Sequence, residues 1–109
     1  MYIDFESIKE VTIPGMNSGT GTMSVRMHND DNYRIIHTVI HPGGSIGNHT
    51  QSTGDDMNFV ISGSGIAVCD GKEEILRPNV MHICPKGSEH SIINNGDEDL
   101  VILTIVVAK

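Results

Sequence analysis

Short β-prone runs alternate with clusters of Gly, Asn, Asp and Pro along almost the whole chain, and this punctuation constrains the fold more than any other feature. No segment keeps the 3.6-residue apolar spacing of a helix, and only residues 4–10 suggest a helical turn. Roughly nine or ten short strands predict an all-β sandwich or closed barrel. The predicted strands are Val11–Ile13, Thr22–His28, Tyr33–Ile40, Asn58–Ile61, Ile66–Cys69, Glu74–Leu76, Met81–Ile83, His90–Ile93 and Leu100–Val107.

Two dipeptides indicate where neighbouring strands turn. Asp70-Gly71 predicts a two-residue hairpin, because a type I′ turn needs positive φ at both positions. Asn95-Gly96 predicts a similar join between the last two runs. The last run, Leu100–Val107, is apolar on both faces, so we expect a central strand that is covered on both sides.

Charge and composition exclude several classes of protein. The chain has 109 residues and a net charge of −7, and it has no basic stripe, which argues against nucleic acid and anionic lipid as partners. It contains no apolar run of ~18 residues, so no membrane span is expected. The first residues lack the pattern of a signal peptide, and Cys69 and Cys84 are expected to be reduced thiols, so we expect a cytoplasmic protein. The acidic pairs Asp30-Asp31 and Glu73-Glu74 are typical of solvated turns.

Alternation along extended backbone would bring four polar side chains to one face. If residues 48–51 are extended, His49 and Gln51 point together because they are two residues apart, and on the following run Asp56 shares a face with Asn58. On a later strand His90 points the same way as Ile92. A single inward face would therefore collect two imidazoles, one amide oxygen and one carboxylate, which is a plausible donor set for a metal ion.

Two segments resemble the two motifs of the cupin family. The first motif has the form Gly, five residues, His-x-His, three or four residues, Glu, six residues, Gly, and its spacing is met by Gly43, His49, Gln51, Asp56 and Gly63. The second has the form Gly, five residues, Pro-x-Gly, two residues, His, three residues, Asn. It is matched by Pro85, Gly87, His90 and Asn94, with Asn79 in place of the leading glycine.

This resemblance extends from about Gly19 to Val107 and implies a jelly-roll, double-stranded β-helix barrel. It implies one cupin domain over residues 1–109, with residues 1–18 as an N-terminal arm. Small cupins commonly pair as homodimers by lending N-terminal strands to a neighbour, so residues 9–28 are the expected contact.

The resemblance also implies a divalent metal ion held by His49, Gln51, Asp56 and His90. Gln51 replaces a histidine and Asp56 a glutamate of the family pattern, which conserves the ligand charge. The amide oxygen is a poorer donor than imidazole and favours Mn²⁺ or Fe²⁺, with Zn²⁺ and Ni²⁺ as further candidates. The alternative is a polar interior in which the four side chains only satisfy one another by hydrogen bonds.

Two functions remain open at this stage. The first is a metal-dependent enzyme acting on a small oxygen-rich organic molecule, as lyase, decarboxylase, isomerase or dioxygenase. The second is a binding module for a sugar or organic acid without turnover. No general acid or base is identified, and the other candidates are Asp55 as a substitute for Asp56, His37 or His41 at the cavity, and a Cys84 nucleophile beside His82.

Overall fold

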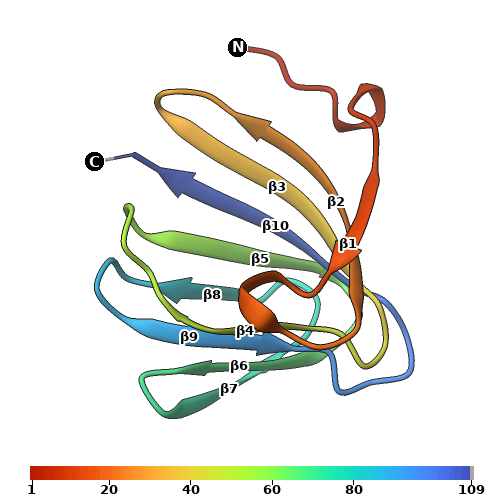
Figure 1. Cartoon of the computed structure of the whole chain (residues 1–109), viewed down its shortest axis with the longest axis vertical. Coiled ribbons are helices and arrows are strands. Elements are labelled where there is room, and N and C mark those ends of the chain that lie inside the picture. The colour runs from red at the N-terminus through yellow and green to blue at the C-terminus, as the bar shows by residue number, and fades with distance from the viewer. Residues whose placement is uncertain (109) are drawn as a thin grey trace.

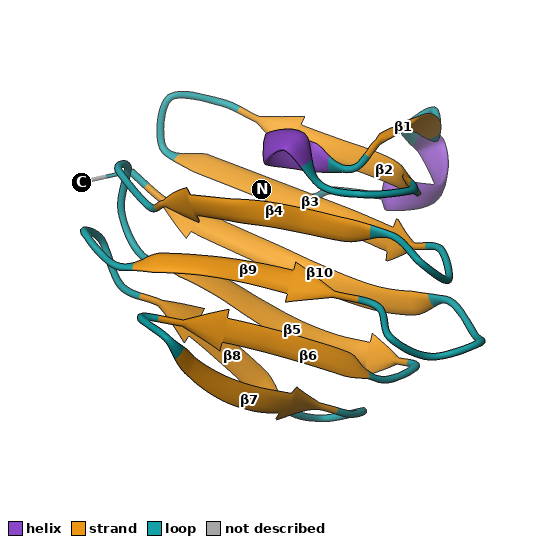
Figure 2. Ribbon diagram, turned by 60° about the horizontal axis from the view of Figure 1, so that its bottom comes forward, coloured by secondary structure: helices purple, strands orange, loops and turns teal. Residues whose placement is uncertain are grey.

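Residues 1–108 are described in the computed structural model, which folds them into two antiparallel sheets that face each other (Figure 1; Figure 2). The larger sheet has the strand order β1-β2-β3-β10-β5-β8, and the smaller has the order β4-β9-β6-β7. Most connections cross between the sheets, which confirms the predicted all-β jelly roll. The strands are β1 (Val11–Pro14), β2 (Thr22–Asn29), β3 (Tyr33–Ile40), β4 (Ser45–Thr50), β5 (Asp56–Ser62), β6 (Gly65–Cys69), β7 (Lys72–Leu76), β8 (Met81–Cys84), β9 (Glu89–Ile93) and β10 (Leu100–Val107).

The N-terminal residues pack along one edge of the larger sheet. A short 3-10 turn, η1 (Phe5–Ser7), lies within the segment predicted to form a helical turn. Arg26 of β2 donates hydrogen bonds to the carbonyl oxygens of Phe5 and Ile8, at 3.0 and 3.1 Å. β1 pairs with β2 of the same chain, with Val11 opposite Val25. No helix among residues 1–108 is both long and apolar enough to cross a membrane.

Inward-facing side chains change character from one end of the barrel to the other. Along β5, Val60 is completely buried in the apolar core, and Asn58 and Asp56 follow on the same face. Along β9, Ile92 in the core is followed by His90. The apolar core therefore fills one end of the barrel and leaves a polar interior at the other. The core residues are Met23, Val25, Ile36, Ile40, Val60, Ala67, Leu76, Ile92, Leu100 and Ile102.

β4 was absent from the predicted strands, and it contains a bulge. Ile46 lies opposite Ile92 and His49 opposite His90, so β4 has one residue more than β9 between these pairs. The extra residue allows Ile46 and His49, three positions apart, to line the same cavity. Gly47 lies inside the bulge, where the backbone of η2 (Met16–Ser18) approaches so closely that a Cβ atom would collide with the backbone oxygen of Asn17. This strand is rich in polar residues and contains a glycine, so β propensity alone does not predict it.

One predicted hairpin is confirmed and the other is wrong. Asp70 and Gly71 have φ angles of 49° and 78° and join β6 to β7, as expected of a type I′ turn. The segment with Asn95-Gly96 instead leads from β9 in the smaller sheet to β10 in the larger one. Asn94 holds this crossing in place, because its side-chain nitrogen donates to the carbonyl oxygens of Ile40 and Glu98, each at 2.8 Å.

The outer face of the larger sheet is apolar across β8, β5, β10 and β3, whereas on β2 the same rows continue with Arg26 and His28. β10 is a central strand between β3 and β5, as predicted, but only its inward face is deeply buried in the single chain. Two rows of outward side chains cross these four strands. They contain one histidine and no other acidic or basic side chain. These rows, which we call the outer apolar face, consist of Met81, Phe59, Leu103 and His37, and of Ile83, Met57, Ile105 and Ile35.

Candidate metal centre

A cavity of about 360 Å³ opens between the two sheets at the polar end of the barrel. Strands β3, β4, β5, β9 and β10 supply most of its wall, and η2 closes one side. The structure places all four predicted ligands, His49, Gln51, Asp56 and His90, on this wall. Residues about forty positions apart in the sequence therefore meet at one cavity, as strand alternation predicted.

Three of these residues each bring one ligand atom to a common point. Nε2 of His90 lies 3.2 Å from Nε2 of His49 and 3.2 Å from Oδ2 of Asp56. The three ligand atoms lie within 4.8 Å of one another. His90 is 1% and Asp56 8% exposed, whereas His49 is half-buried. Two imidazoles and a carboxylate at this spacing match the ligands of first-row divalent metals.

Hydrogen bonds behind the two imidazoles determine which ring nitrogen faces the cluster. Nδ1 of His49 lies 2.9 Å from the carbonyl oxygen of Gly47. A carbonyl only accepts, so Nδ1 carries the proton and the neutral ring turns its Nε2 lone pair towards the cluster. Nδ1 of His90 lies 2.9 Å from Nε2 of His82, on the side away from the cavity. The Nε2 atoms of both rings are therefore the ones that face Asp56.

Asp56 carries a carboxylate oxygen that no described protein group satisfies. Its Oδ1 atom is buried and has no hydrogen-bond partner among residues 1–108. Leaving such an oxygen unpaired costs about 1–3 kcal/mol, and more for a charged group. A divalent cation at the cluster would offset the charge of this carboxylate and would accept the imidazole lone pairs. The donor set and the orphaned oxygen together fit a metal ion.

Gln51 lies at the same cavity with its amide held in one orientation. Its side-chain nitrogen donates to the carbonyl oxygens of Thr53 at 3.1 Å and Gly54 at 3.2 Å. Both amide hydrogens are used in this way, so Oε1 is the atom that remains available as a ligand. The residue is only 8% exposed. Its hydrogen bonds go to the β4–β5 loop and not to the other three predicted ligands.

The other candidate residues from the sequence lie away from this cavity. Asp55 accepts the backbone N–H of Lys86 at 3.0 Å, outside the barrel. His41 bonds to Ser24 and Asp99 near the surface, at 2.8 and 2.9 Å. His37 belongs to the outer apolar face, beside Phe5. Alternation along the strands therefore identified the inward residues better than the mere presence of a titratable side chain.

The proposed Cys84 nucleophile is not supported by its surroundings. Cys84 is completely buried, and burial together with Cys69 raises the pKa of its thiol to about 12. A thiol in this state is not a nucleophile at neutral pH. The nitrogens of His82 instead bond to His90 and to Glu74, the latter at 2.8 Å.

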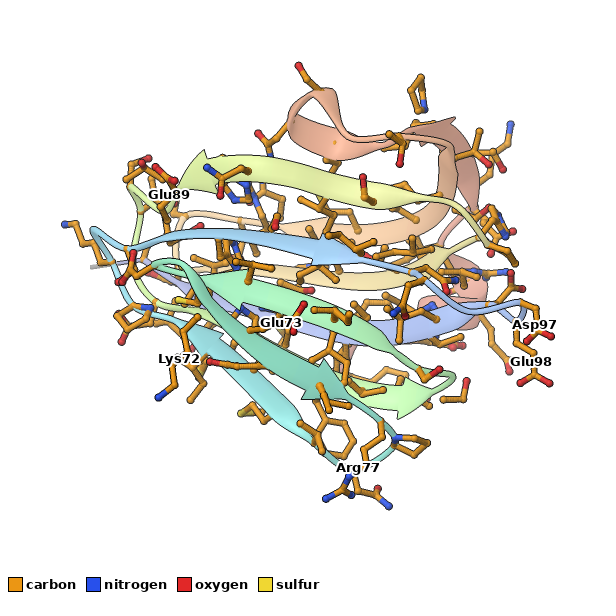
Figure 3. The ribbon with its side chains drawn as sticks, turned by 90° about the horizontal axis from the view of Figure 1, so that it is seen from below. Lys72, Glu73, Arg77, Glu89, Asp97 and Glu98 are labelled. Carbon is orange, nitrogen blue, oxygen red and sulfur yellow. The ribbon has the colours of Figure 1, made fainter. Side chains whose placement is uncertain are left out.

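Glu74 is the residue that the sequence argument missed. The prediction of a solvated acidic pair is wrong for this residue, because Glu74 shares the inward face of β7 with buried Leu76. Its neighbour Glu73 does point outward over the smaller sheet (Figure 3). The available signal was strand alternation, which places Glu74 on the same face as Leu76 and on the opposite face to Ile75.

Comparison with known proteins gives a family and a fold. The sequence profile of the family described as Cupin domain matches residues 36–106. A protein named oxalate-binding protein from Thermotoga maritima is 24% identical over 114 residues, which cover 98% of this chain and 93% of that protein.

Several solved structures share the architecture. A crystal structure described as a predicted oxalate decarboxylase from Thermotoga maritima has a TM-score of 0.91 at 21% identity and covers 100% of both chains. A polyketide cyclase from Streptomyces resistomycificus has a TM-score of 0.77 at 19% identity, covering 100% of this chain and 80% of that one. At these identities the likeness concerns the fold and leaves the activity open.

Proposed function

This chain belongs to the cupin domain family, and we propose that it holds a divalent transition-metal ion through His49, Gln51, Asp56 and His90. The observation that carries the proposal is the convergence of the Nε2 atoms of His49 and His90 and a carboxylate oxygen of Asp56, which lie within 4.8 Å of one another. Two neutral imidazoles, a neutral amide and one carboxylate leave a single negative charge, which favours a divalent cation. The oxygen ligands favour Mn²⁺ or Fe²⁺, and Zn²⁺ and Ni²⁺ are the further candidates.

We propose a small organic acid as the ligand of this centre. The cavity of about 360 Å³ is of a size for a small molecule. Among the described residues that line it, Arg34 is the only lysine or arginine. A guanidinium is well suited to a carboxylate because it presents paired N–H donors. The relative named oxalate-binding protein supports the same class of ligand.

The first proposed function is metal-dependent turnover of such an acid. A bound ion would supply Lewis acidity, which polarises a carboxylate or carbonyl oxygen. The chain's own contribution is to orient the molecule and to limit its contact with water. Thr104 donates a hydrogen bond to the side-chain oxygen of Asn58 at 2.7 Å, which makes part of the wall a rigid polar surface. Decarboxylation, isomerisation, elimination and oxygenation all fit this constellation.

The second proposed function is binding of the acid without turnover. Among the described residues that line the cavity, His49, Asp56 and His90 are the only histidines and acids, and all three belong to the proposed ligand set. The wall therefore offers no separate general acid or base. This observation favours a binding module over an enzyme that must move a proton.

A direct screen separates the two functions. The protein loaded with Mn²⁺ or Fe²⁺ is titrated with oxalate, a catechol, a thiol and a keto acid, with calorimetry for binding and chromatography for products. Tight binding of an unchanged acid supports the second function, and a new product supports the first. Arg34→Gln should weaken the binding of acids, whereas Arg77→Gln, which removes a charge at the far end of β7, should not (Figure 3). No binding of any acid by the metal-loaded protein would contradict both functions.

We also propose that the chain forms a homodimer through the outer apolar face rather than through residues 9–28. In the structure those residues contain β1 and β2, which pair with each other within one chain. Met81 and Ile83 on the outer apolar face are each 46% exposed, and such apolar surfaces mark contact sites. Each copy carries a net charge of −7, so two copies would repel except where they meet on an uncharged face.

Figure 3 supports this assignment of faces. Glu73 lies over the smaller sheet, and Asp97 and Glu98 lie in the β9–β10 loop, away from the outer apolar face.

The single cupin domain over residues 1–109, with residues 1–18 as an arm, stays a prediction. A cytoplasmic location also stays a prediction, and the free thiols of Cys69 and Cys84 are in keeping with a reducing compartment.

A further inference from the structure

A row of hydrogen bonds runs from the candidate metal centre to the outside of the barrel. It begins at His90 on β9, passes to His82 on β8 and ends at Glu74 on β7. Nε2 of His82 lies 2.9 Å from Nδ1 of His90, and Nδ1 of His82 lies 2.8 Å from Oε1 of Glu74. His82 is 0% exposed, whereas the side chain of Glu74 is 41% exposed. The row therefore connects the cluster to solvent across the seam between the two sheets.

When both imidazoles are neutral, the carboxylate at the outer end determines where the protons in the row lie. A carboxylate only accepts, so Nδ1 of His82 must carry a proton. Nε2 of neutral His82 is then an acceptor and must receive a proton from Nδ1 of His90. Neutral His90 is left with a bare Nε2, the atom 3.2 Å from Oδ2 of Asp56.

We propose that Glu74 and His82 are positioning residues, which fix the tautomer and the ring orientation of His90 so that its Nε2 lone pair faces the metal. This inference rests on the proposed metal centre and adds two residues to it. A second-sphere acceptor behind a ligating histidine orients the ring and raises its basicity, and its loss typically lowers metal affinity about 10–100-fold. Glu74 and His82 would thus act on the metal without touching it.

Glu74 is needed because the two imidazoles alone do not determine which of them donates the hydrogen bond between them. Without it, His82 could donate through Nε2 to Nδ1 of His90. His90 would then carry its proton on Nε2 and would present an N–H, not a lone pair, to the cluster. The reversed arrangement would give His90 an N–H towards Oδ2 of Asp56, 3.2 Å away, but it would leave a lone pair on Nδ1 of His82 facing the Glu74 carboxylate. The Glu74 contact is the shorter of the two, at 2.8 Å, and it therefore disfavours the reversed arrangement.

Two measurements test the proposal. Long-range ¹H–¹⁵N spectra of the metal-free protein report which nitrogen of each ring is protonated, and calorimetry reports Mn²⁺ affinity. We expect His90 protonated on Nδ1 in the wild type and a mixture of tautomers in Glu74→Gln. We expect Mn²⁺ affinity to fall about tenfold in Glu74→Gln and 10–100-fold in His82→Leu. His82→Gln should recover part of this loss, because its amide oxygen can accept from Nδ1 of His90.

Glu73→Gln is the matched control, since it removes the same charge from the adjacent outward position on β7. If Glu74→Gln and Glu73→Gln give the same tautomer and the same affinity as the wild type, the proposal is overturned. If His82→Leu does not fold, the His90 tautomer and the Mn²⁺ affinity of Glu74→Gln, compared with those of Glu73→Gln, still test the proposal. A wild type that shows the expected tautomers but binds no metal would refute the metal centre and not the hydrogen-bonded row.

Discussion

His49 and His90 lie directly opposite each other on β4 and β9, and their Nε2 atoms are 3.2 Å apart. This pairing depends on the bulge in β4, because a strand that slips by one residue turns its side chains to the opposite face. The carbonyl oxygen of Gly47, inside the same bulge, accepts the hydrogen bond that orients the His49 ring. The bulge in β4 therefore determines both the face on which His49 lies and the orientation of its ring.

Replacing the glycine in the bulge should damage stability and the site together. A Cβ atom in Gly47→Ala would collide with the backbone oxygen of Asn17, which cannot move as a side chain can. We expect a loss of about 2 kcal/mol or more in the free energy of unfolding, measured by denaturant titration. Gly96→Ala is the control, since its nearest neighbours lie at 3.5 Å, and it should change stability by less than about 0.5 kcal/mol. Equal stability of the two variants would refute this role of Gly47.

Removing the charge of Asp56 should affect metal binding and stability in opposite directions. Asp56→Asn deletes the only carboxylate of the proposed ligand set, so Mn²⁺ affinity should fall by more than about 100-fold, beyond the typical loss from a second-sphere change. The metal-free variant should be as stable as the wild type or up to about 1 kcal/mol more stable, because an amide can donate to the lone pairs that now face a carboxylate.

Calorimetry with Mn²⁺ and thermal unfolding of the metal-free proteins measure the two effects. Asp55→Asn serves as the control, since that carboxylate bonds to the backbone of Lys86 outside the cavity. Wild-type affinity in Asp56→Asn would argue against a metal ligand at this position.

The Cys84 thiol should be unreactive in the folded protein. Burial, with Cys69 nearby, raises its pKa from 9.0 to about 12, so the thiolate is not formed at pH 8. An aromatic disulfide reagent should label Cys84 only after denaturation. The raised pKa also stabilises the fold below pH 9.0, and this contribution should be lost as the pH rises towards 12, because the unfolded chain releases the proton first. Rapid labelling of Cys84 in the native state would contradict this description of the thiol.

A charge on the outer apolar face should separate the proposed dimer. Ile83→Lys places an ammonium group on β8, at one edge of this face, so a dimer in the wild type should become a monomer, as measured by size exclusion with light scattering. Ile75→Lys is the control, because Ile75 is 75% exposed on the outer side of the smaller sheet. A monomeric wild type, or a dimer that only Ile75→Lys disrupts, would exclude the proposed interface.

The sequence predicted the parts of this protein that depend on local rules. Turn residues and alternation are sufficient to place β5 and β9, and with them the inward direction of Asp56 and His90. The spacing from His49 to Gly63 identified the segment that carries three of the proposed ligands. These features repeat every two residues or lie within one turn, so they can be read without knowledge of the fold.

The sequence did not predict the features that depend on distant neighbours. β4 was missed because its bulge is stabilised by contact with η2 and by pairing with β9, and not by β propensity. Asn95-Gly96 looked like a hairpin, but the strands that it joins belong to different sheets. Glu74 appeared to be a surface acid until the structure placed β7 beside β8, where its carboxylate meets His82.

The most direct test of the central claim is elemental analysis of protein purified without chelator, for the wild type and for His90→Ala. We predict about one Mn, Fe, Zn or Ni ion per wild-type chain, and its loss in a His90→Ala variant that keeps the β-rich circular dichroism of the wild type. A wild type that stays free of metal even after exposure to these ions would contradict the claim. Metal content that His90→Ala leaves unchanged would contradict it equally.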